Sequence, residues 1–131
     1  MKTINDKQKC IFCSCSHEKY IAENDFAFAI FDNFPVNKGH ALIIPKRHFA
    51  SFFEATEDEI NAIYKLINEV KTKIDTELEP DGYNIGINIG EPAGQTIMHL
   101  HIHLIPRYNG DVLNPRGGIR NFKKALVKYN G

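Results

Sequence analysis

Two segments in the second half of the chain alternate apolar and polar residues with a period of two. The first, 83–90, alternates Tyr and Ile with Asn and Gly, and the second, 98–104, alternates apolar residues with histidines. Side chains two positions apart on a β-strand point to the same face. Each segment therefore predicts a strand with one apolar face. The histidine row comprises His99, His101 and His103, and the side chains predicted to enter the core behind it are Met98, Leu100, Ile102 and Leu104.

The remaining pattern predicts an α+β fold with a mainly antiparallel sheet. Three further strands are expected at 19–23, 26–31 and 40–45, each next to a polar turn or to Pro and Gly. A long helix is expected to begin after Thr56 and to end at Pro80, because Thr56 and Glu59 form a capping-box pattern. The apolar positions at helical spacing are expected to pack in the core, with a subunit interface as the alternative, and they are Ile60, Ile63, Tyr64, Ile67, Val70, Ile74 and Leu78.

Composition narrows the class of protein. The chain has 131 residues, which suits one domain, and its 16 basic and 16 acidic residues cancel. This balance argues against broad electrostatic binding to nucleic acid or to an anionic membrane. No apolar stretch reaches the roughly 20 residues of a membrane span, and the polar N-terminus has no signal-peptide core. A cytoplasmic protein is expected.

Three histidines in one strand offer a nucleophile, a proton donor and a ligand within the length of one substrate. The competing interpretation is a metal-dependent hydrolase or oxygenase, because two imidazoles spaced by two residues also present ligands to zinc or iron. Against that alternative, the strand contains no Asp or Glu to complete such a site.

Three segments resemble the histidine triad (HIT) family of nucleotide hydrolases and transferases. They are "GQT" followed by His-x-His-x-His, "GHALIIPKRH" (39–48) and "FAIFDNFPVNKGH" (28–40). The resemblance covers roughly residues 10–108, and it implies a single HIT domain over 1–131 with a C-terminal arm at 109–131. It also implies an antiparallel sheet with one long helix and shorter flanking helices, and a homodimer whose sheets run on into each other.

The resemblance implies a role for each matching residue. His101 would attack the α-phosphorus of a nucleotide to form a nucleotidyl-histidine, which water then hydrolyses. A backbone carbonyl holding the other ring N–H would fix the tautomer. The remaining implied catalytic residues are His99, His103 and His40. The implied substrate-binding residues are Asp32 and Asn33 near the ribose, Asn88 near ribose and phosphate, and Gln95 and Thr96 at the α-phosphate or leaving group.

The third histidine favours the hydrolase side of the family, because the branch that transfers sugar nucleotides has glutamine there. "EPAGQT" (91–96) and the Pro-Arg after the triad resemble the branch that cleaves dinucleoside polyphosphates. An adenosine-containing nucleotide is therefore the expected substrate, with AMP-phosphoramidates and aminoacyl-AMP as other candidates. A nucleotide-binding adaptor with little turnover is the non-enzyme alternative.

The cysteines form a separate cluster. Cys10 and Cys13 make a C-x-x-C pair, which needs two further ligands to hold tetrahedral zinc. Family members with such a pair bind zinc with the histidines that match His48 and His99, so the resemblance implies a structural Cys₂His₂ zinc site. No organic cofactor and no catalytic metal are expected. The alternative is a flexible N-terminus with free thiols, and Cys15 has no assigned role.

Overall fold

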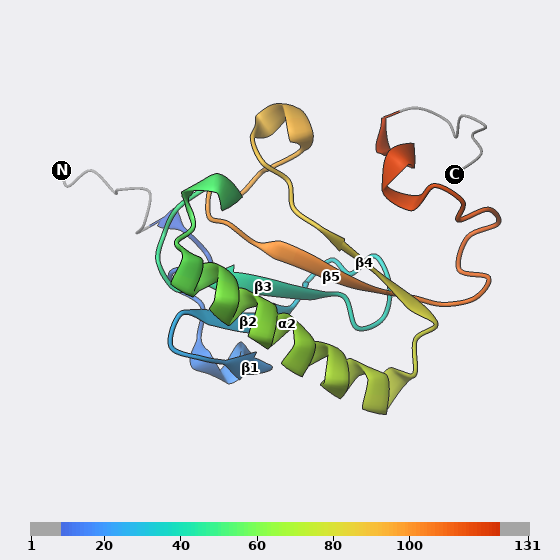
Figure 1. Ribbon diagram of the computed structural model, residues 1–131, viewed down its shortest axis with the longest axis horizontal. Coiled ribbons are helices and arrows are strands. Elements are labelled where there is room, and N and C mark those ends of the chain that lie inside the picture. The colour runs from blue at the N-terminus through green and yellow to red at the C-terminus, as the bar shows by residue number, and fades with distance from the viewer. Residues whose placement is uncertain (1–8, 124–131) are drawn as a thin grey trace.

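The computed structural model describes residues 9–123 as an antiparallel sheet of five strands with one long helix across a face (Figure 1). The strands lie in the order β1-β2-β3-β5-β4. Their bounds are β1 Ala22–Glu23, β2 Ala27–Phe31, β3 Ala41–Pro45, β4 Gly82–Gly86 and β5 Ile102–Arg107. The helix, α2, spans Glu57–Leu78, and four short 3-10 helices are η1 His17–Lys19, η2 Phe52–Glu54, η3 Glu91–Ala93 and η4 Gly118–Phe122. The predicted α+β class is confirmed.

Helix α2 begins where the capping pattern places it. The Thr56 hydroxyl accepts from the Glu59 N–H at 3.1 Å, and a Glu59 carboxylate oxygen accepts from the Thr56 N–H at 2.9 Å. This reciprocal pair satisfies two of the backbone donors that a helix N-terminus leaves unpaired. The helix ends with Glu79 in the left-handed conformation (φ 49°), directly before Pro80.

The buried stripe of α2 differs from the predicted one. Tyr64 is 68% exposed, Ile60 and Ile67 are only half-buried, and Leu66, which the prediction omitted, is fully buried. The sequence carries apolar residues on two adjacent stripes, and the sheet covers only one of them, because a flat face contacts a limited arc of a helix. The apolar residues of that buried stripe are Ala62, Ile63, Leu66, Val70 and Ile74.

The two faces of the sheet carry different cores. On the face beneath α2, small side chains of β2 and β3 let the helix approach closely, and the buried strand residues there are Ala27, Ala29, Ala41, Ile43, Ile102 and Leu104. On the opposite face, turned away from the viewer in Figure 1, Phe28, Leu42 and Ile44 pack against Cys10 and Phe12. This second core positions the N-terminal segment against the sheet.

The strands are shorter than predicted. β4 ends at Gly86 rather than 90, β1 has two residues rather than five, and β5 begins only at Ile102. The segment before β5 bonds to a loop instead of a strand, because the Leu100 N–H donates to the Phe49 carbonyl at 2.7 Å. Of the three histidines, therefore, only His103 lies in a strand. The predicted core position of Met98 is wrong, since Met98 is exposed.

Strand β4 lies at the edge of the sheet beside the histidine strand, with Gly86 paired to His103. A Cβ on Gly86 would meet no atom within 4 Å. Helix α2 packs against β1, β2 and β3, so the predicted apolar face of β4 is incompletely covered and Ile85 is 48% exposed. The open side of β4 thus adjoins His103, as its alternating pattern suggested.

The C-terminal arm predicted for 109–131 includes η4, and residues 124–131 lie outside the described residues. A Cβ on Gly118 would lie 3.6 Å from the Asn84 amide nitrogen, so the arm returns to β4. Between residues 9 and 123, no helix has the length and apolar character needed to span a bilayer.

Candidate functional site

The ring of His101 is held in one tautomer. Its Nδ1 lies 2.8 Å from the backbone oxygen of His99. A carbonyl oxygen only accepts hydrogen bonds, so Nδ1 carries the proton and the neutral ring keeps its lone pair on Nε2. The side chain is 8% exposed, and no partner for Nε2 occurs within residues 9–123. An imidazole fixed in this way is suited to act as a nucleophile through Nε2.

His40 and His103 form a chain of hydrogen bonds whose direction is fixed at one end. The Val36 N–H donates to His40 Nδ1 at 3.0 Å, so the proton of neutral His40 lies on Nε2. His40 Nε2 lies 2.9 Å from His103 Nδ1, which must accept, and the proton of His103 then lies on its Nε2. That Nε2 is buried and, in the described part of the chain, has no hydrogen-bond partner. The hydrogen-bond chain therefore ends in the N–H of His103 Nε2, a donor that a bound ligand could use.

Burial keeps both rings neutral. Desolvation lowers the pKa of His103 to about 4, and neighbouring His101 and His40 contribute to that lowering. Desolvation also lowers the pKa of His40, although Asp32 opposes that shift. Two neutral rings preserve the proton chain at neutral pH, because a second proton on His103 would place two N–H groups against each other.

The pKa of His103 predicts how stability depends on pH. An unfolded histidine titrates near pH ~6.5, so between that value and about 4 the unfolded chain binds more protons than the folded one. The free energy of unfolding should therefore fall as pH is lowered through this window, by up to about 1.4 kcal/mol per pH unit from this group. Urea unfolding of wild type and His103→Asn measures it. The variant should show a shallower decline, and equal slopes would contradict the assignment.

Asp32 lies next to this chain. One carboxylate oxygen is 3.4 Å from His40 Nε2, and the other accepts from the Phe34 N–H at 2.9 Å. Asp32 and His40 come from opposite ends of the loop 32–40, which closes when the Asp32 N–H donates to the His40 carbonyl at 2.9 Å. Asn33, also predicted near the ribose, is exposed.

Three other predicted substrate-binding residues lie in or before the loop that precedes His99. Gln95 is buried, and its amide is already used: Oε1 accepts from the Gly90 N–H, and Nε2 donates to the carbonyls of Ala50 and Ile97. Both amide hydrogens are spent, so the side chain braces the loop rather than offering a donor to phosphate. Thr96 and Asn88 are both exposed.

A separate cluster of possible metal ligands contains one potential ligand atom from each of four residues, all within 4.8 Å of one another. These residues are Cys10, Cys13, His48 and His99. His99 Nδ1 is 3.3 Å from Cys10 Sγ, 3.5 Å from Cys13 Sγ and 3.1 Å from His48 Nδ1. Cys13 Sγ is 3.3 Å from His48 Nδ1. Tetrahedral zinc with two sulfur and two nitrogen ligands needs these atoms roughly 3.3–3.8 Å apart. The donor set and its dimensions fit that ion.

The tautomer of His99 also fits a ligand. Its Nε2 lies 2.8 Å from the Pro45 carbonyl, so Nε2 carries the proton and the Nδ1 lone pair faces the sulfurs. Metal-binding histidines usually donate their other N–H in this manner. The Cys13 N–H donates to Cys10 Sγ at 3.5 Å.

A second group of possible metal ligands is equally compact, and it consists of Asp32, His40 and His103. The histidine strand itself contains no Asp or Glu, as the sequence showed, but the fold brings Asp32 to this group from another segment. The tautomers nevertheless argue against a metal there. The Val36 N–H occupies His40 Nδ1 and puts the proton on Nε2, so a metal at Nε2 would demand a doubly deprotonated ring.

Phe12, between the two cysteines of the C-x-x-C pair, was not predicted as part of the site. Its buried ring packs against His99 at 5.7 Å and against His101 at 5.1 Å between centroids. The lone aromatic residue in "CIFC" was the available signal. Two cations, Lys46 and Arg107, are paired with Glu23 and Asp111 at 2.8 Å.

The HIT domain matches residues 15–110 of the sequence. The chain belongs to the HIT family. A HIT family protein from Bacillus anthracis is similar in structure, with 37% identity, a TM-score of 0.72 and coverage of 78% of this chain and 75% of that one. A zinc-bound histidine triad family protein from Mycobacterium smegmatis aligns with a TM-score of 0.73 and 31% identity, covering 82% and 81% of the two chains.

A relative with an assigned activity is the adenosine 5′-monophosphoramidase hnt1 of Schizosaccharomyces pombe. It is 36% identical over 104 residues, which are 76% of this chain and 75% of the relative. The HIT chain described here thus resembles proteins that handle nucleotides, and the family prediction from the three sequence segments is confirmed.

Proposed function

We propose that this HIT protein is an enzyme that cleaves nucleotides at the α-phosphate and releases a nucleoside monophosphate through a nucleotidyl-His101 intermediate. The observation that carries the proposal is the 2.8 Å contact between His101 Nδ1 and the His99 carbonyl. This contact leaves Nε2 as the only ring atom with a free lone pair. The same carbonyl stabilises the positive charge that forms on the ring when Nε2 is phosphorylated.

The reaction has two displacement steps. In the first, the Nε2 lone pair forms a bond to the α-phosphorus while the bond to the leaving group breaks, and the leaving group takes the electron pair and a proton from solvent. In the second, water attacks the same phosphorus and releases a proton to solvent, the P–N bond breaks, and the ring regains its lone pair. Splitting one displacement into two lowers each barrier, because imidazole is both a good nucleophile and a good leaving group.

The His40–His103 chain supplies the hydrogen-bond donor. The unpartnered N–H of His103 Nε2 would donate to a non-bridging oxygen of the α-phosphate, where negative charge increases in the transition state. The rings of His101 and His103 are 5.2 Å apart between centroids, close enough for both to reach one phosphate. Asp32, with two carboxylate oxygens, would accept hydrogen bonds from the two ribose hydroxyls.

The substrate proposed is an adenosine nucleotide, with dinucleoside polyphosphates and AMP-linked amides as the two candidates. The name of the yeast relative favours an AMP–nitrogen bond, whereas the "EPAGQT" segment favours a polyphosphate. A nucleotide-binding adaptor is the second candidate function, and it differs from the first in having no covalent intermediate.

The experiment that tests the function is acid-free quenching during turnover of a dinucleotide or an AMP-amide labelled in the α-phosphate. The label should appear on His101 in a linkage that acid cleaves and base does not. A sample that turns over substrate without such a label would contradict the covalent route, and a sample that only binds AMP would favour the adaptor.

We further propose that Cys10, Cys13, His48 and His99 hold a structural zinc ion. The ion, when bound, supplies four strong bonds between the N-terminal turn, the segment after β3 and the segment before β5. The proposal is supported by the interatomic distances of the cluster and by the tautomer of His99. The zinc-bound relative shows that a family member carries this metal.

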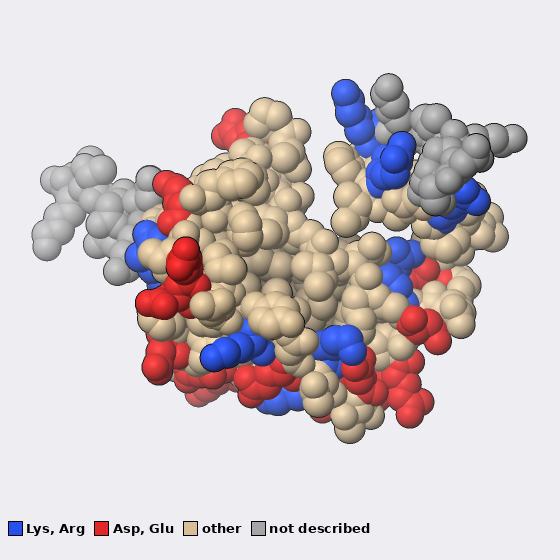
Figure 2. All heavy atoms as spheres, in the orientation of Figure 1, with Lys and Arg blue, Asp and Glu red and all other residues tan. Residues whose placement is uncertain are grey.

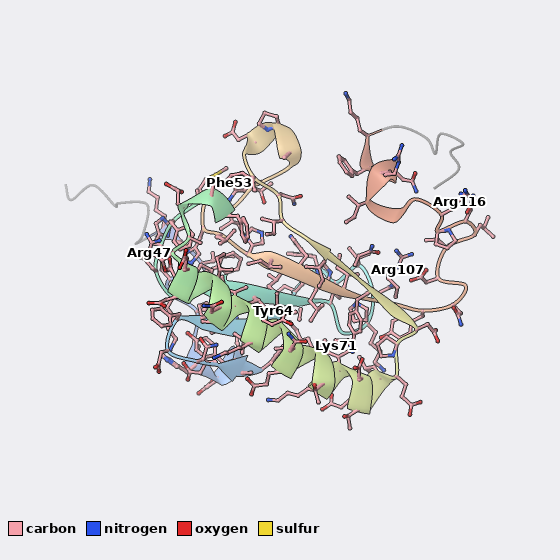
Figure 3. The ribbon with its side chains drawn as sticks, viewed as in Figure 1. Arg47, Phe53, Tyr64, Lys71, Arg107 and Arg116 are labelled. Carbon is pink, nitrogen blue, oxygen red and sulfur yellow. The ribbon has the colours of Figure 1, made fainter. Side chains whose placement is uncertain are left out.

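A homodimer is also proposed, formed through the β4 edge. The backbone of an edge strand has unpaired donors and acceptors that can extend the sheet into a second copy. The adjoining surface has an area without charged side chains between α2 and the η3 loop (Figure 2), and exposed Phe53 and Tyr64 lie along it (Figure 3). Ile85, on β4 itself, is 48% exposed, and a second copy at this edge would bury it.

Replacing Ile85 with lysine should convert the dimer into a monomer, because a lysine on an edge strand must lose water on pairing. Light scattering after size-exclusion chromatography measures the mass. Phe26→Lys is the matched control: Phe26 is 43% exposed and lies next to β1 and β2, at the other side of the sheet. A dimer that survives Ile85→Lys but not Phe26→Lys would place the interface at the other edge.

A further inference from the structure

Asp111, four residues after the end of β5, accepts hydrogen bonds from three residues. Oδ1 accepts from Arg107 Nη2 at 2.8 Å, and Oδ2 accepts from Arg107 Nε at 2.8 Å and from Asn37 Nδ2 at 2.7 Å. The Tyr108 N–H adds a fourth bond at 3.2 Å. The side chain itself is 13% exposed, although the residue as a whole lies at the surface.

Through Asn37, this carboxylate holds the loop 32–40 that carries Asp32 and His40. The second hydrogen of the Asn37 amide donates to the Pro106 carbonyl at 3.1 Å, and the Tyr108 hydroxyl donates to the Lys38 carbonyl at 2.8 Å. The Asn37 carbonyl in turn accepts from the His40 N–H at 3.1 Å. The loop is thus attached to the end of β5 by a set of polar contacts that converge on Asp111.

Apolar packing holds the same loop at Gly39 but not at Phe34 or Val36. Its large apolar side chains point to solvent, with Phe34 88% and Val36 70% exposed. Gly39 has a φ of 89°, and a Cβ there would lie 2.7 Å from Leu78 and 3.1 Å from Pro106, so its backbone packs closely against apolar side chains. The two ends of the loop adjoin the paired strands β2 and β3. The middle of the loop is held by hydrogen bonds, and the bond from Asn37 to Asp111 involves a charge.

We propose that Asp111 is a positioning residue that sets the ribose specificity of the site by fixing the loop of Asp32 and His40. The inference rests on the proposed function, because it assumes that Asp32 binds the ribose hydroxyls. Arg107 has the same positioning role, since it bridges Asp111 and the Asn84 amide of β4, the latter at 2.6 Å. Asp111 itself lies outside the substrate contacts.

The test compares an AMP-linked substrate with its 2′-deoxy analogue. The wild type should prefer the ribose form, since Asp32 pairs with both hydroxyls only when the loop is correctly placed. In Asp111→Asn an amide N–H₂ faces the donors of Arg107 or Asn37, so the loop loses its attachment. The preference, measured as the ratio of kcat/KM for the two substrates, should fall about tenfold, mostly through KM.

Two further variants make the result specific. Asn37→Ala removes the same link from the loop side and should lower the ratio similarly, and the double variant should lose little more than either single one. Asp75→Asn is the matched control, because the Asp75 carboxylate also accepts two short bonds, from Lys71 at 2.7 Å and Tyr83 at 2.6 Å, on the helix side. It should leave the ratio unchanged.

The outcomes separate this inference from the proposed function. A wild type that turns over both substrates equally, or neither, contradicts the assumed role of Asp32 and thus the basis of the inference. A wild type that prefers ribose, together with variants of Asp111 and Asn37 that keep that preference, would overturn the positioning role alone. If Asp111→Asn does not fold, the Asn37→Ala ratio decides between these results.

Discussion

His101→Ala should lose nucleotide turnover by at least about 10⁴-fold in kcat, while its affinity for AMP changes little. The proposed nucleophilic atom disappears, but the Asp32 carboxylate, which is proposed to bind the ribose, and the His103 donor remain in place. Steady-state hydrolysis and equilibrium binding of AMP measure the two quantities. The size of the effect reflects the single free lone pair that the His99 carbonyl leaves on the ring.

The control for that variant is His17→Ala. His17 is exposed, contacts only Tyr20 among the aromatic rings of the described chain, and should tolerate the change. His101→Gly with added imidazole offers a second check, because a diffusible ring can restore part of the nucleophile's role. Turnover that survives in His101→Ala would refute the covalent mechanism, whatever the variant binds.

Cys10→Ser and Cys13→Ser should each lower the thermal midpoint by roughly 10 °C and abolish copurification of zinc. A structural zinc site contributes folding free energy directly, and a hydroxyl in place of a thiolate removes one of its four ligands. Calorimetry and elemental analysis of the purified protein measure the two effects. Treatment of the wild type with a strong chelator should produce a similar shift.

Cys15→Ser is the matched control, since Cys15 is also half-buried and lies two residues from Cys13, but is outside the metal-ligand cluster. It should keep both the midpoint and the metal. Wild-type protein that purifies without zinc, and whose midpoint is unaffected by chelator and by Cys10→Ser, would leave the four residues as an ordinary polar contact.

Local signals in the sequence predicted the elements of the fold well. The Thr56–Glu59 pair fixed the start of α2, because both partners lie within one helical turn and the capping bonds need nothing else. Period-two alternation identified the strands but overestimated their length. Alternation reports which side a residue faces, whereas a strand ends where its partner strand ends, and the partner is distant in sequence.

The sequence motifs predicted which residues gather at the site, but not all of the contacts among them. The sequence and the resemblance named the histidines and cysteines that the fold brings together, yet they offered no means of seeing that Asp32 lies beside the His40–His103 chain or that Gln95 is consumed by its own loop. The first depends on the contact between His40 and His103, which are 63 residues apart, and the second depends in part on the Ala50 carbonyl, 45 residues before Gln95. The pairing of Arg107 with Asp111 had a local signal, because a carboxylate four residues after an arginine is within reach of its guanidinium.

His99 contacts both the cysteine pair and His101, so oxidation of the cysteines should affect His101. The His99 ring contacts the Cys10 and Cys13 sulfurs, and its own carbonyl oxygen fixes the tautomer of the neighbouring ring at 101. An oxidant that joins or caps those thiols would shift the peptide group of residue 99 and thereby disturb the reactive nitrogen without touching it. Oxidation of the two thiols and loss of nucleotide turnover should therefore occur together.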